Sequence, residues 1–173
     1  MRLKGVLFIW CFMHFSMGFS QNADYKSVFA DNVEIFRKCI SKSNRDSALL
    51  ILNANEKLFS KHPEDDIKYV LYFQKALYYR LIEDNVNLLK YCRPAYNYFK
   101  ENKKNKYELE TAFLLASYYF TGSGYDSTIF YCNAYIPLAV KLKAYNTLTA
   151  LYLLKGKSLF SKGELNEAAD ILR

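Results

Sequence analysis

The chain has 173 residues, of which 24 are basic and 17 acidic, so its formal net charge is +7. This excess is mild and the lysines are scattered, which argues against a dedicated nucleic-acid-binding protein. With only six glycines, three prolines and an apolar fraction of 51%, the chain is expected to bury one continuous helical core.

The first 20 residues have the pattern of a secretory signal peptide. A short basic start is followed by an apolar run over residues 6–15 and then by small residues. We expect cleavage between Ser20 and Gln21, with export to the periplasm or cell envelope. The alternative is an uncleaved membrane anchor, but the run is shorter than the roughly 20 apolar residues of a spanning helix. No stable membrane span is predicted within residues 21–173.

Four segments align when the sequence is shifted by 40 residues. Residues at equivalent positions form columns, of which one lies on the predicted first helices and another on the predicted second helices. The first-helix column is Phe36, Ala76, Ala116 and Gly156, and the second-helix column is Leu52, Cys92, Cys132 and Leu172. A register that recurs over most of a chain predicts stacked copies of one supersecondary unit, whose surfaces are used for binding.

The apolar spacing is helical, and the breaks between apolar stretches are rich in Asn, Asp, Ser and Gly, which cap helices. We therefore predict an all-α array of about eight helices in four antiparallel pairs. The expected units are residues 24–62, 63–103, 104–143 and 144–173, the last incomplete. Pro94 and Pro137 fall inside predicted second helices, where each is expected to kink the helix or mark an irregular turn.

The columns resemble the tetratricopeptide repeat. The best copy is the last, Tyr152-x-x-Lys155-Gly156-x-x-Leu159, followed by Ala168 and Leu172. The resemblance covers residues 24–173 and implies an α-solenoid with a right-handed superhelix. The period is 40 instead of 34, and the six extra residues are expected to lengthen the second helix and the loop between units. An α-solenoid of another kind, with a period of 40–47, is the alternative.

The sequence contains no motif of a known catalytic site, and we predict no enzyme activity, cofactor or metal site. His62 is expected to be a solvated loop residue, because no metal-binding partners accompany it. Cys39, Cys92 and Cys132 are an odd number, and the last two are expected to be buried free thiols. The basic segment 100–106 is expected to be a solvated loop.

The aromatic residues are numerous, and the tyrosines at repeat positions are expected to fill the core. These are Tyr72, Tyr79, Tyr119 and Tyr152. The resemblance implies that the first helices line a groove for a peptide with an acidic group. The groove candidates are Phe73, Leu77, Arg80, Phe113, Ser117, Phe120, Thr121, Leu153, Lys157 and Ser161. The alternative is that the three phenylalanines only pack against neighbouring first helices.

These patterns predict a non-enzymatic, exported helical-repeat module that binds a protein or peptide and no nucleic acid. Because Arg173 falls inside the last predicted helix, we also expect a longer chain, in which this region is the sensor part of a signalling protein. The alternative function is an envelope structural or assembly factor that self-associates through the open end of the array.

Overall fold

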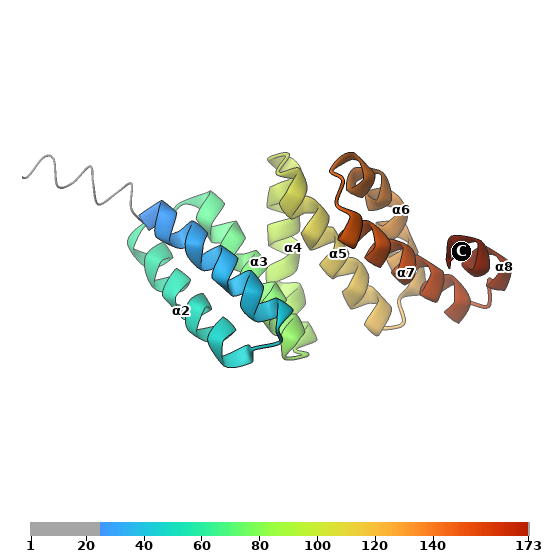
Figure 1. Ribbon diagram of the computed structural model, residues 1–173, viewed down its shortest axis with the longest axis horizontal. Helices are drawn as coiled ribbons and strands as arrows, with labels where there is room; N and C mark the ends of the chain where they lie inside the picture. The colour runs from blue at the N-terminus through green and yellow to red at the C-terminus, as the bar shows by residue number, and fades with distance from the viewer. Residues whose placement is uncertain (1–24, 173) are drawn as a thin grey trace, which may run out of the picture. The chain divides into compact units, whose positions relative to one another are not determined.

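The computed structural model describes residues 25–172, so the predicted signal peptide lies outside the described part. Within that part the chain forms eight helices and no strand, which confirms the all-α helical-repeat architecture. Within each of the two units described next, Figure 1 shows consecutive helices running antiparallel. The described residues fall into two compact units, divided between Pro63 and Glu64.

The first unit contains the helix over residues 25–41 and a second helix. The second unit contains six helices, in which each helix contacts the next and α5 also contacts α7. The bounds are α2 (Arg45–Lys61), α3 (Asp65–Leu81), α4 (Asn85–Glu101), α5 (Asn105–Thr121), α6 (Tyr125–Lys141), α7 (Tyr145–Ser161) and α8 (Leu165–Leu172).

The spacing of the helices is regular. Helices α2 to α7 have 17 residues each, and three residues separate each helix from the next. The expected longer loop between units is therefore wrong, since turns within and between pairs are equally long. The extra length relative to a tetratricopeptide repeat lies in the helices.

Six of the seven turns share one backbone conformation. Their middle residue has a positive φ and is a glycine only at Gly163, which has φ +84°. In the turn after α3, the amide of Asp84 donates to the carbonyl of Tyr79 and the amide of Glu83 donates to that of Arg80. This bond pair is the Schellman motif, which satisfies the last carbonyls of a helix. The remaining turn has Pro63 in the middle and lacks a positive φ.

Replacing Glu83 with glycine should stabilise the protein. Glu83 is exposed and has φ +63°, a conformation that strains a residue with a Cβ atom. We expect the free energy of unfolding in urea to rise by about 0.5–1 kcal/mol. The matched control is Lys90→Gly inside α4, which should lower it by about 1 kcal/mol. A destabilising Glu83→Gly would contradict this turn geometry.

The two prolines do not interrupt their helices. Helix α4 continues past Pro94 to Glu101, and α6 continues past Pro137 to Lys141. Each helix lacks one amide donor at its proline. The expectation of an irregular turn at these positions is wrong.

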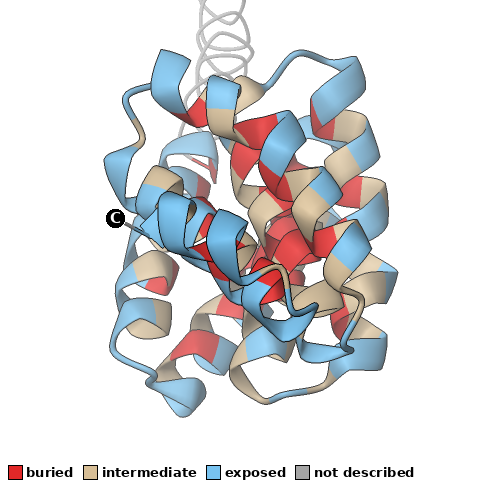
Figure 2. Ribbon diagram, turned by 90° about the vertical axis from the view of Figure 1, so that its right-hand side faces the viewer, coloured by how far each residue is buried: buried red, intermediate tan, exposed pale blue. Residues whose placement is uncertain are grey.

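The core is built from the repeat columns. Phe36, Ala76 and Ala116 are fully buried and Gly156 is also buried. A Cβ atom added at Gly156 would lie 2.6 Å from Cγ of Leu172, so glycine gives α8 the room to approach α7. Figure 2 shows the buried residues as stripes on the helix sides that face other helices. The small residues of the first helices therefore make room for the second helices.

Some expected core residues are more accessible. Tyr72, Tyr79 and Tyr119 are partly buried and pack against the core of the second unit. Tyr152 is 37% exposed, so the expectation that it fills the core is wrong.

Candidate binding surface

The first helices α3, α5 and α7 carry all ten groove candidates. Five are exposed, namely Arg80, Thr121, Leu153, Lys157 and Ser161. Four are partly exposed, namely Leu77, Phe113, Ser117 and Phe120. The tenth, Phe73, is buried and its ring meets the ring of Tyr107 edge-on at a centroid distance of 5.8 Å. Because α5 and α7 are in contact, their candidates lie on adjoining helices.

A half-open pocket lies at one end of the contact between α5 and α7. Its cavity volume is about 310 Å³, close to the lower limit of small-molecule sites. Side chains from the start of α5, the α6–α7 turn and the start of α7 line it. They are Lys106, Leu109, Glu110, Leu142, Ala144 and Thr147. None of these six was a groove candidate.

Two stacked tyrosine pairs recur in the 40-residue register. Tyr79 of α3 stacks on Tyr91 of α4 with ring centroids 5.7 Å apart, and Tyr119 of α5 stacks on Tyr131 of α6 at the same distance. Arg93 donates a hydrogen bond of 3.1 Å to the Tyr119 hydroxyl. In the helix pairs α3–α4 and α5–α6, a stacked tyrosine pair thus joins the first helix to the second.

A polar chain connects α4, α5 and α6 inside the second unit. The Tyr96 hydroxyl donates to the Tyr135 hydroxyl at 2.7 Å, and Tyr135 donates to Oε1 of Glu108 at 2.9 Å. Burial raises the pKa of Tyr135, and the hydrogen bond that its hydroxyl donates to Glu108 adds to this rise. Its hydroxyl therefore stays protonated as a donor, which suits a structural role.

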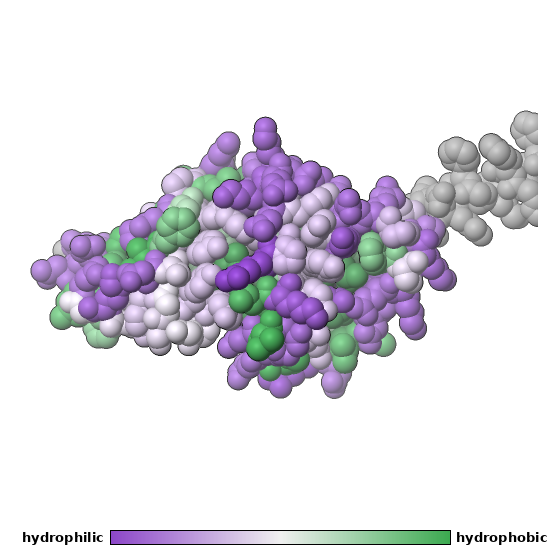
Figure 3. Space-filling model, turned by 180° about the vertical axis from the view of Figure 1, so that it is seen from behind, coloured by the Kyte–Doolittle hydropathy of each residue, from purple (hydrophilic) through white to green (hydrophobic). Residues whose placement is uncertain are grey.

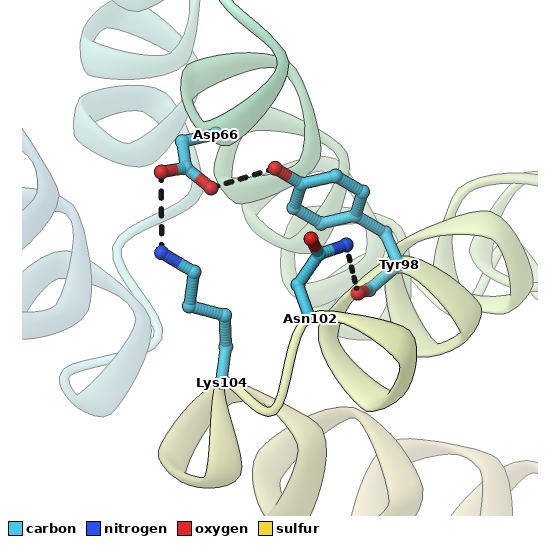
Figure 4. Close-up of polar contacts among 4 residues, drawn as sticks. All are labelled: Asp66, Tyr98, Asn102 and Lys104. Atoms are coloured by element: carbon cyan, nitrogen blue, oxygen red, sulfur yellow. Dashed lines mark hydrogen bonds and ion pairs between the residues drawn. The ribbon is translucent and has the colours of Figure 1, made fainter.

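A second polar group joins the start of α3 to the end of α4 and the following turn (Figure 4). The Tyr98 hydroxyl donates to Asp66 at 2.7 Å, and Nζ of Lys104 lies 3.2 Å from the other carboxylate oxygen of Asp66. The bond to Asp66 raises the pKa of Tyr98 to about 12. The basic segment 100–106 is exposed except for the partly exposed Asn105 and contains the turn between α4 and α5, as expected, and its Lys104 also holds this ion pair.

His62 lies in the turn between α2 and α3, as expected, but it is only partly exposed. Its ring stacks on Tyr25 at a centroid distance of 4.0 Å within the first unit. Among residues 25–172 no group of three or more His, Cys, Asp or Glu side chains could hold a metal ion.

The cysteines should differ in reactivity. All three in the described part are free; Cys92 and Cys132 are buried, and Cys39 is partly exposed. Burial raises the pKa of Cys92 to about 12 and that of Cys132 to about 11. Thiolates are the reactive form, so we expect iodoacetamide at pH 8 to label Cys39 within minutes and the other two only after unfolding. Peptide mapping by mass spectrometry measures this, and rapid native labelling of Cys132 would contradict its burial.

No protein-family model matches this chain, and none of the curated proteins is significantly similar to it. The helical-repeat fold therefore rests on the structure, and membership of the tetratricopeptide family stays a prediction. Among the described helices, none is both long and apolar enough to cross a membrane.

On the face that Figure 3 shows, hydrophobic residues gather in small groups between hydrophilic ones. Such a mixture of apolar and polar residues is usual for the surface of a folded protein.

Proposed function

We propose that this protein is a non-enzymatic helical-repeat module that binds a protein or peptide along the first helices α5 and α7. The observation that carries the proposal is the meeting of these two helices beside a half-open pocket. Exposed Leu153 and Lys157 on α7 add an apolar and a basic group to the same helix layer. Such a combination suits an extended peptide with acidic residues.

The proposed module acts outside the cytoplasm. The basic and apolar pattern of residues 1–20 supports export. Expression with a C-terminal reporter, followed by cell fractionation and mass spectrometry of the N-terminus, tests this. A cytoplasmic protein that retains residues 1–20 would refute export.

Peptide binding is tested by selecting from a displayed library of random peptides with the purified protein. The double variant Leu153→Glu/Lys157→Glu changes two residues one turn apart on α7. We expect it to weaken the selected peptides about tenfold or more in fluorescence polarisation. The matched control is Val86→Glu/Lys90→Glu on α4, where an exposed apolar residue and a lysine have the same spacing. Equal losses in both variants, or no selected peptide, would refute binding along the first helices.

A second candidate function is self-association as an envelope structural or assembly factor. Its support is the exposure of large apolar side chains on α7 and α8, with Phe160 66%, Leu165 57% and Leu172 48% exposed. Exposed apolar side chains in one region favour association between proteins. Light scattering across a hundredfold concentration range tests it, and a constant monomer mass would refute it.

A further inference from the structure

The pocket between α5 and α7 has a closed counterpart one repeat earlier. A shift of 40 residues aligns Thr147 with Tyr107, Ala144 with Lys104 and Lys106 with Asp66. The pairs of helices involved are α5 with α7 and α3 with α5. Comparing the pocket with the equivalent position between α3 and α5 shows which side chains the pocket lacks.

In the earlier copy, aromatic side chains fill the position that is equivalent to the pocket. The ring of Tyr107 stacks on Phe99 at a centroid distance of 4.8 Å and meets Phe73 edge-on. The ion pair between Lys104 and Asp66 closes the rim, and Figure 4 shows it beside the Tyr98 ring.

In the later copy, both stacked rings are absent. Ala139 stands at the position of Phe99, and Thr147 stands at the position of Tyr107. The ion pair is also absent, because Lys106 replaces the acid and Ala144 replaces the lysine. The result is a cavity of about 310 Å³ that is lined by buried Leu109 and by the exposed basic residue Lys106, among others.

We propose that this pocket binds an aromatic side chain of a partner peptide together with a neighbouring carboxylate. The aromatic ring takes the space that Tyr107 fills in the earlier copy. The ligand carboxylate lies beside Ala144, at the position that Lys104 has in the earlier copy, and it pairs with Lys106. The ion pair of the earlier copy is thereby restored with the two charges exchanged. This inference rests on the proposed peptide-binding function and names the anchor of its ligand.

The charge around the pocket favours an acidic partner. The two segments that flank it, residues 100–106 and 141–147, contain six lysines and one glutamate. The rest of residues 64–172 contains eight basic and eleven acidic residues, so positive charge is concentrated at these two turns. Glu110 is the one acid among the six lining residues, and it lies one helical turn beyond Lys106. A ligand carboxylate is therefore favoured on the side of the turns.

The test uses the library selection described above and two pocket variants of the full chain. We expect the selected peptides to share an aromatic residue next to Asp or Glu. Thr147→Tyr restores the ring of the earlier copy, so it should fill the pocket and lower affinity about tenfold or more while the melting temperature is kept or raised. Lys106→Asp should weaken the same peptides and lower the salt dependence of binding.

Matched controls are Thr149→Tyr, an exposed threonine on the same helix, and Lys90→Asp on α4. Both should leave affinity within about twofold, since neither residue lines the pocket. If peptides are selected but bind Thr147→Tyr as well as the original protein, the pocket proposal is overturned and the binding function stands. If no peptide is selected, both are overturned.

Discussion

Replacing Phe99 with alanine should lower the free energy of unfolding by about 3–5 kcal/mol. Phe99 lies on α4 with 1% of its surface exposed, and it is part of a buried cluster with Ala95 and Leu115. Its ring also stacks on Tyr107 of the next helix. Alanine would leave a cavity between α4 and α5 that the surrounding rings cannot fill. Urea denaturation followed by circular dichroism measures the change.

The control for this prediction is Phe130→Ala on α6. Phe130 is also on the second helix of a pair, but 68% of it is exposed. We expect its replacement to change the free energy of unfolding by less than about 0.5 kcal/mol. Similar values for the two variants would show that α4 and α5 do not pack as described.

Replacing Ala116 with leucine should destabilise the protein by about 2–3 kcal/mol. Ala116 is fully buried on α5, in a cluster with Cys132 of α6. The Thr128 hydroxyl of α6 donates to the Ala116 carbonyl at 3.3 Å, so the two helices are close at this point. Three additional carbon atoms would force them apart and break that hydrogen bond. The midpoint of thermal unfolding should fall accordingly.

Ala134→Leu on α6 provides the same chemical change at an exposed position. Leucine and alanine have similar helix propensities, so the expected change is within about 0.5 kcal/mol. If Ala116→Leu is tolerated, close packing of the helices is not the reason why small residues recur at this position of the repeat.

The helices and their order could be predicted from the sequence because both depend on local chemistry. Capping residues such as Asn44 and Asp84 accept amides three residues later, as their position before an apolar stretch indicates. Small residues recurring at one position, such as Ala76 and Ala116, likewise indicated where the first helices contact the second helices. The irregular turns expected from the local effect of Pro94 and Pro137 do not form, since α4 and α6 continue past them and each packs between two neighbouring helices.

The binding surface was only partly predictable. Register placed the groove candidates on the first helices, but it could not show that Phe73 is buried under Tyr107. The pocket was missed because it results from missing side chains at Ala139, Ala144 and Thr147. Comparing these positions with Phe99, Lys104 and Tyr107 gives an indication of the pocket, but only the structure shows that Ala144 and Thr147 line it together.

The equal spacing of the turns limits how such an array can change its length. From α2 to α7 each helix and the turn after it occupy 20 residues, so the two helices of the α3–α4 pair and of the α5–α6 pair have the same length. If a whole pair is lost or duplicated, first helices, which carry the small buried residues, still alternate with second helices. Every remaining turn is also left intact. Loss of one helix, for example α5, would join α4 directly to α6, two helices that carry the same second-helix pattern. The pair is therefore the smallest step by which this array can grow or shrink and keep its core.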